Sequence, residues 1–183
     1  MVDYLRSRCP HTAVACLYAD YKDQSNQTLG PILGTFLRQL LTTTSESIPD
    51  EVTQKLLKIQ LEGGKVGAED NLALLKIQLQ QLKHAFICID AVDELEPKVR
   101  RQLLNALKEL KTNNTRLFLT GRDNVKNDIR ECFLVTEVVI SASEQDIETF
   151  VRKQIKDDPY SSAMDAQLEK DITDAIIKKS QGM

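Results

Sequence analysis

Short apolar runs alternate along the chain with longer stretches in which apolar residues recur every three or four positions. Runs without alternation suit strands that are covered on both faces in a parallel sheet. The longer stretches have the spacing of amphipathic helices. Strands separated by helices predict an α/β domain with a mainly parallel sheet. We predict four strands, at residues 12–19, 86–89, 116–120 and 134–141.

The helical pattern is clearest between Leu29 and Leu41, where the apolar residues follow one face of a helix. Pro97 suits the first turn of another helix, and Ser143 and Asp146 form a near capping box before a third. Similar patterns predict four further helices. One ends near Cys9, one starts near Ser47, one runs from about Glu69 to Leu82, and the last has its apolar residues between positions 168 and 176.

The length and composition indicate one globular domain. The chain has 183 residues, of which 42% are hydrophobic, 28% are charged and only 5% are aromatic, so the core must be mostly aliphatic. We treat 1–183 as one domain with a core at about 12–141 and C-terminal helices at about 143–180. No repeat and no low-complexity tract divides it.

The charge and hydropathy argue against a nucleic acid or a membrane as partner. A formal net charge of −3 and a pI near 5.5 give no bulk attraction to nucleic acid or to anionic lipid. No apolar run approaches the roughly 20 residues that span a bilayer, and the first residues do not resemble a signal peptide. We expect a protein of the reducing cytoplasm.

The cysteines and histidines do not predict a metal site or a disulfide. The four cysteines form no CxxC pair, and both histidines precede strands, away from any plausible ligand set. We expect reduced, structural thiols. The residues are Cys9, Cys16, Cys88, Cys132, His11 and His84.

Acidic residues gather where the second predicted strand ends. Asp90, Asp93 and Glu94 lie within five residues of one another, so their carboxylates repel unless a cation or a proton compensates them. The next strand ends at Thr120 and is followed by Arg122. Parallel strands place their carboxyl ends on one edge of the sheet, where open α/β sheets bind ligands. We therefore expect the three acids and the arginine to converge there.

Two interpretations of this cluster stay open. In the first, one carboxylate holds Mg²⁺, a later one orients or deprotonates a water, and Arg122 stabilises phosphate charge, as in the Walker B region of nucleotide triphosphatases. In the second, the acids cap the helix that begins at Pro97, and Arg122 pairs with Asp123 in a solvated turn.

Several motifs together resemble a known family. FICIDAVDEL, LYADYKDQSNQT, LGPILGTFLRQLL, RLFLTGR and the closing KKSQGM are similar to NACHT-type signal-transducing ATPases, particularly fungal proteins with nephrocystin-3-like N-terminal domains. The similarity extends over nearly the whole chain. It implies a three-layer fold of the P-loop NTPase (ASCE/STAND) type, with ATP and Mg²⁺ as ligands and a role in intracellular signal transduction.

The resemblance also assigns roles to single residues. Asp90 matches the carboxylate that coordinates magnesium, and Arg122 matches the sensor arginine that faces phosphate. Asp93 and Glu94 match an added acidic pair, in which Glu94 is the preferred candidate for the hydrolytic base. Other protein domains, or further copies of the same chain, are the partners that it implies.

One part of the family pattern is missing. No G-x-x-x-x-G-K-[ST] occurs in the sequence, so the chain resembles a domain that is incomplete at its N-terminus and lacks the first strand, the P-loop and most of the first helix. The missing strand would lie between the strands at 116–120 and 134–141. Removing one preorganised hydrogen-bond donor to the charge that develops in a transition state raises the activation free energy by about 2.7–4 kcal/mol, and a P-loop supplies several such donors. We therefore do not expect this chain alone to hydrolyse ATP efficiently.

Three functions follow from these observations. The first is an incomplete NACHT-like module that switches with its nucleotide, and the second is a non-catalytic interaction fragment that retains the acids only by descent. The third is a Mg²⁺-dependent phosphoesterase that uses Asp90 and Asp93; it needs further acids from other strand ends, where only Asp20 is available.

Overall fold

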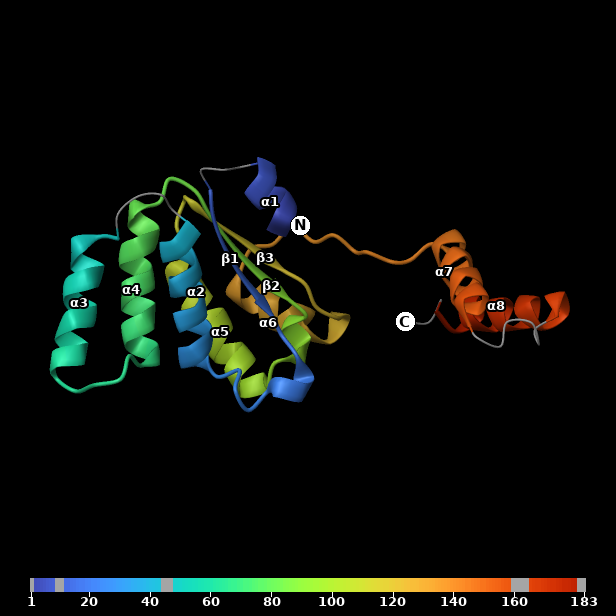
Figure 1. The fold of residues 1–183 in the computed structure, drawn as a ribbon, viewed down its shortest axis with the longest axis horizontal. Helices are drawn as coiled ribbons and strands as arrows, with labels where there is room; N and C mark the ends of the chain where they lie inside the picture. The colour runs from blue at the N-terminus through green and yellow to red at the C-terminus, as the bar shows by residue number, and fades with distance from the viewer. Residues whose placement is uncertain (1, 9–11, 44–47, 159–164, 181–183) are drawn as a thin grey trace. The chain divides into compact units, whose positions relative to one another are not determined.

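The computed structural model describes residues 2–8, 12–43, 48–158 and 165–180, so Cys9, His11 and Ser47 lie outside the described part. The chain divides into two compact units, Met1–Val135 and Thr136–Met183, and each is described by itself (Figure 1).

The first unit contains a three-stranded parallel sheet. Its strands are β1 (Ala13–Tyr18), β2 (Ala85–Asp90) and β3 (Thr115–Leu119), in the order β1-β2-β3. Ala13 lies opposite Ala85, and Ala85 lies opposite Thr115, so the three carboxyl ends reach the same edge. The α/β class and the first three predicted strands are confirmed.

Helices and 3₁₀ turns connect the strands of this unit. Most helices match the predicted patterns, whereas α6 was not predicted, because its seven residues are too few to establish a helical period. The helices are α1 (Val2–Arg8), α2 (Leu29–Thr43), α3 (Asp50–Leu61), α4 (Ala68–Gln81), α5 (Pro97–Leu110) and α6 (Lys126–Cys132), and the turns are η1 (Tyr21–Asp23), η2 (Val92–Glu94) and η3 (Asp123–Val125).

The main core lies on one face of the sheet. Helix α2 packs on β1, α4 packs on α2, and α3 lies on the outer side of α4 (Figure 1). Phe36 of α2, Ile87 of β2 and Leu104 of α5 are at most 1% exposed and belong to one continuous cluster. Aliphatic residues dominate this cluster, as the composition predicts.

The opposite face of the sheet has a thinner cover. Val14 and Cys88 are buried there, and Leu5 of the short helix α1 packs against them. Towards the carboxyl ends of the strands, Tyr18 and Phe118 of the same face are 64% and 42% exposed. The sheet is therefore well covered on one face and only partly covered on the other.

The strand predicted at 134–141 is wrong. These residues form no regular structure, although their sequence, LVTEVVIS, is rich in β-branched side chains. A strand is stable only when its backbone groups find a ladder partner, and β-propensity alone does not supply one. Leu134 and Ile140 are 98% and 86% exposed.

The second unit is a pair of helices, α7 (Glu144–Asp157) and α8 (Ala166–Ser180). The predicted capping box is present, because Ser143 Oγ accepts from the Asp146 backbone N–H and the Asp146 carboxylate accepts from Ser143. These hydrogen bonds lower the pKa of Asp146. Arg152 of α7 pairs with Glu169 of α8 at 3.8 Å. Among all helices in the described ranges, none is long and apolar enough to cross a membrane.

A first prediction concerns the buried thiol of Cys88. Burial raises its pKa, and the neighbouring Cys16 adds to the rise. The unfolded thiol therefore ionises at a lower pH than the folded one, so the stabilisation is complete below about pH 8.5 and is lost as the pH rises through the folded pKa. We expect Cys88→Ala to flatten the alkaline decline in the free energy of unfolding, measured by urea denaturation at a series of pH values. An unchanged decline would contradict this assignment.

Candidate functional site

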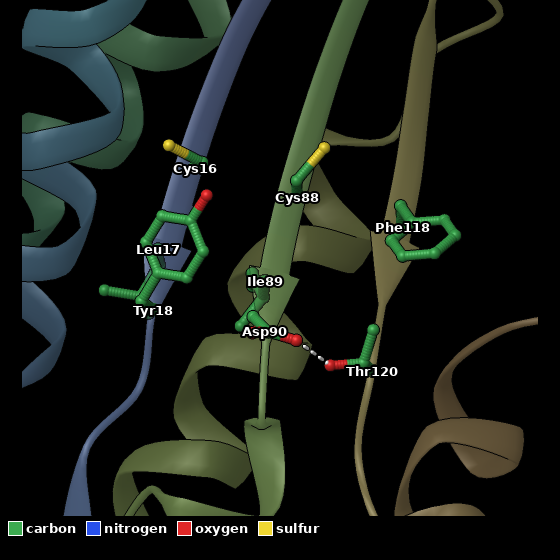
Figure 2. Close-up of a pocket in the computed structure, with 8 residues that line it drawn as sticks. All are labelled: Cys16, Leu17, Tyr18, Cys88, Ile89, Asp90, Phe118 and Thr120. Atoms are coloured by element: carbon green, nitrogen blue, oxygen red, sulfur yellow. Dashed lines mark hydrogen bonds between the residues drawn. The ribbon is translucent and has the colours of Figure 1, made fainter. Parts of the chain in front are cut away.

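Asp90 and Thr120 join the carboxyl ends of β2 and β3. Asp90 is the last residue of β2 and is exposed, and the Thr120 hydroxyl donates a short hydrogen bond to its Oδ1 (Figure 2). The same hydroxyl accepts from the Ala91 backbone N–H at 2.9 Å. Two strand ends that lie thirty residues apart in the sequence are thus joined through one threonine.

The backbone turns sharply after Asp90. Ala91 has φ 55° and ψ 49°, and within the described ranges it is the only residue other than glycine with a positive φ. Left-handed backbone costs a non-glycine residue roughly 1–3 kcal/mol, so the surroundings must impose it. The Val92 N–H donates to the Thr120 carbonyl at 2.9 Å, which holds the turn. This turn directs η2, with its two acids, towards the end of β3.

Asp93 and Arg122 meet across these two strand ends. The Arg122 backbone N–H donates to Asp93 Oδ1 at 3.2 Å, and Arg122 Nε lies 3.5 Å from Asp93 Oδ2. The Asp93 side chain is only 8% exposed, whereas that of Arg122 is 82% exposed. Asp93 therefore fixes the loop after β3, and most of the Arg122 guanidinium stays accessible to solvent. The expected convergence of these residues is present.

Glu94 is held by the loop that follows β1. The Tyr21 backbone N–H donates to Glu94 Oε2 at 3.2 Å, and Gln24 Nε2 donates to the Glu94 carbonyl at 2.8 Å. Sequence reasoning did not predict either contact, because the partners are seventy or more residues apart and no local pattern relates them. In the same loop, the Asp20 carboxylate accepts from the Lys22 backbone N–H at 2.9 Å, as is typical of an aspartate that forms a turn.

The hydrogen bonds observed for the three acids do not cap the N-terminus of α5. Asp90 is bonded to Thr120, Asp93 to Arg122 and Glu94 to the backbone of Tyr21. Glu96, the residue before α5, makes no side-chain capping bond. The Arg122 guanidinium pairs with Asp93 across the site, whereas the second interpretation expected it to pair with Asp123.

A shallow hollow of about 220 Å³ lies beside Asp90 on the thinly covered face of the sheet (Figure 2). Tyr18 and Phe118 line two sides of it, and Asp90 and Thr120 form its polar end. Its remaining lining residues are Cys16, Leu17, Cys88 and Ile89. The three described cysteines are free thiols. Throughout the described residues, no group of three or more His, Cys, Asp and Glu side chains is placed to hold a metal ion.

Fold and site together define an α/β protein with an open parallel sheet and an acidic cluster at the carboxyl ends of its strands. A family model described as nephrocystin 3, N-terminal, matches residues 1–122, about two thirds of the chain, and the chain belongs to that family. The matched range includes Asp90, Asp93, Glu94 and Arg122. A search of curated proteins found no match.

Proposed function

We propose that the chain is part of a NACHT-type signalling module that binds ATP with Mg²⁺, and that the site described above is the magnesium-facing half of its nucleotide site. The observation that carries this proposal is the connection of the two strand ends. The Thr120 hydroxyl joins Asp90, and Arg122 joins Asp93, so carboxylate and guanidinium groups share one edge of the sheet. Open α/β sheets bind ligands at this edge.

The donor set at Asp90 fits Mg²⁺. Magnesium prefers oxygen ligands, keeps several waters, and is bound in nucleotide sites through one or two carboxylates together with phosphate oxygens. Asp90 offers an exposed carboxylate at the strand end, with the Thr120 hydroxyl as its neighbour. When bound, the ion would neutralise charge on the phosphates. Thr120 would then orient the Asp90 carboxylate.

The other residues of the site have separate roles in this proposal. Asp93 orients the loop that carries Arg122, so that the exposed guanidinium can contact phosphate oxygens. The Glu94 carboxylate accepts a hydrogen bond from the Tyr21 N–H, and we propose it as the general base that would take a proton from the attacking water. Because the sequence contains no phosphate-binding loop, we expect weak nucleotide binding and no efficient hydrolysis by this chain alone.

Paramagnetic NMR with Mn²⁺ in place of Mg²⁺ tests the proposal. We expect Mn²⁺ to broaden the amide signals of 89–94 and 120–122 selectively, because an ion on the Asp90 carboxylate lies close to both strand ends. Asp90→Asn should abolish this broadening. Asp123→Asn is a matched control, since Asp123 is an exposed acid of the neighbouring turn η3, and it should leave the broadening unchanged.

Adding ATP separates the proposal from the alternative of a non-catalytic interaction fragment. If the site is half of a nucleotide site, ATP should increase the broadening at low Mn²⁺, and Arg122→Gln should weaken that increase. Equal broadening at all surface acids, with no effect of Asp90→Asn, would favour the interaction fragment and would contradict the proposed function.

A further inference from the structure

The Arg100 side chain joins two segments that both lead into the candidate site. Its Nε donates to Asp128 Oδ2 at 3.0 Å, and its Nη1 donates to the Leu95 carbonyl at 3.3 Å. Leu95 directly follows η2, the turn that carries two of the acids, and Asp128 lies in the first turn of α6. One guanidinium therefore links the end of η2 with the helix that follows η3.

The ion pair of Arg100 and Asp128 is partly shielded from solvent. Their side chains are 13% and 41% exposed, whereas those of Lys76 and Glu109, which pair α4 with α5, are 42% and 54% exposed. Burial reduces the screening of a charge pair by water and salt. The guanidinium also has its donors in a fixed planar arrangement, so two acceptors on different segments hold it in one orientation. The pair is therefore suited to fix α6 relative to η2.

The connection from Asp128 to Arg122 is short and closely packed. Turn η3 lies between Arg122 and α6, and the Val125 N–H donates to the Arg122 carbonyl at 3.2 Å. Val125 is 1% exposed, and a Cβ at Gly121 would lie 2.9 Å from Val125 and 3.0 Å from Val92 of η2. Closely packed segments transmit a displacement to one another. A movement of α6 away from η2 would therefore also move Arg122.

We propose that Arg100 is a positioning residue of the candidate site and that it acts through Arg122. By binding Asp128 and the Leu95 carbonyl, it keeps η3 against η2 and places the exposed Arg122 guanidinium beside Asp93. The contact of Arg122 with phosphate rests on the proposed function, whereas the effect of Arg100 on the position of Arg122 does not. The competing role is purely structural: Arg100 would stabilise the packing of α6 on α5 without any effect on Arg122.

The amide signals of Asp93 and Arg122 in the whole chain without ligands are the first test. Arg100→Gln removes the charge and the fork of donors, and Asp128→Asn removes the partner charge at a partly exposed position, where the fold should be retained. We expect both variants to shift the two signals, because the Arg122 N–H donates to Asp93 Oδ1 at 3.2 Å. Lys76→Gln is the matched control, since it breaks the ion pair between α4 and α5, and it should leave both signals unchanged.

Broadening by Mn²⁺ in the presence of ATP is the second test, and it connects the position of Arg122 to the proposed nucleotide site. We expect Arg100→Gln to reduce the ATP-dependent increase about as strongly as Arg122→Gln does. The variant with both substitutions should show no greater loss than Arg122→Gln alone, because residues that act through one contact are not additive. Broadening at Asp90 by Mn²⁺ without ATP should stay unchanged, and a general loss of structure would abolish it.

The two tests fail in different ways. The positioning role is wrong if Arg100→Gln and Asp128→Asn leave the ligand-free Arg122 signal unchanged, or if the control variant shifts it equally. Additive losses from Arg100→Gln and Arg122→Gln would also overturn it, because the two residues would then act independently. A wild-type chain on which ATP has no effect would contradict the proposed function instead, and the ligand-free signals would still decide the role of Arg100. Should Arg100→Gln not fold, Asp128→Asn decides the first test alone.

Discussion

Phe36→Ala should lower the free energy of unfolding by about 3–5 kcal/mol, the range found for large aromatic residues in closely packed cores. Phe36 is fully buried in α2, within the cluster that lies between the sheet and the helices. Its removal leaves a cavity that Leu33 and Leu40, which are also fully buried in α2, can fill only by moving the helix. Domains of this size are stable by about 5–15 kcal/mol, so the variant should be close to unfolding near physiological temperature.

Urea denaturation followed by far-UV circular dichroism measures this loss. Phe118→Ala is the matched control, because it removes the same kind of side chain from a position that is 42% exposed. We expect this substitution to lower the free energy of unfolding by less than about 1 kcal/mol. Equal losses from Phe36→Ala and Phe118→Ala would show that α2 does not pack on the sheet as described.

Gly121→Ala should have the second largest effect, and it acts directly on the candidate site. A Cβ at this position would lie 2.9 Å from Val125 Cγ2, 3.0 Å from Val92 Cγ1 and 3.3 Å from Asp93 Oδ1. Val92 and Val125 are at most 1% exposed, so neither side chain has room to withdraw. We expect a loss of about 1–3 kcal/mol, as for other overpacked sites, and a separation of η2 from η3.

Stability and local structure can be measured together for this variant. The amide signals of Asp93 and Arg122 should shift, because the clash would displace the hydrogen bond that joins them at 3.2 Å. Gly30→Ala is the control: a Cβ there has its nearest neighbour at 3.7 Å, and alanine suits a helix better than glycine, so stability should stay unchanged or rise slightly. If Gly121→Ala left both stability and these signals unchanged, the close approach of the two turns would be wrong.

The local patterns of the sequence predicted most of the first unit. The helical spacing from Leu29 to Leu41 matches α2, and the apolar run at 86–89 lies within β2. These predictions are confirmed because period and burial agree within one short segment. Residues 134–141 are the counterexample: their composition favours a strand, yet they form none, because strand formation depends on a ladder partner elsewhere in the chain.

In the candidate site, too, some features follow from local sequence patterns and others depend on contacts between distant segments. The rule that parallel strands end on one edge was sufficient to predict that Asp93 and Arg122 come together from two different strand ends. It was not sufficient to predict how they are bonded. The threonine bridge to Asp90, the left-handed turn and the loop that holds Glu94 involve contacts between distant segments, which no local pattern encodes.

The sequence by itself determined the elements of the first unit, the aliphatic core and the position of the acids at a strand end, because these depend on short-range periodicity and on the chirality of parallel connections. Only the tertiary structure decided which backbone edges have partners, which face of the sheet is covered and which side chain holds each acid. Those features depend on contacts between distant segments. They determine how the acids at the end of β2 are bonded and which strands of the sheet pair with each other.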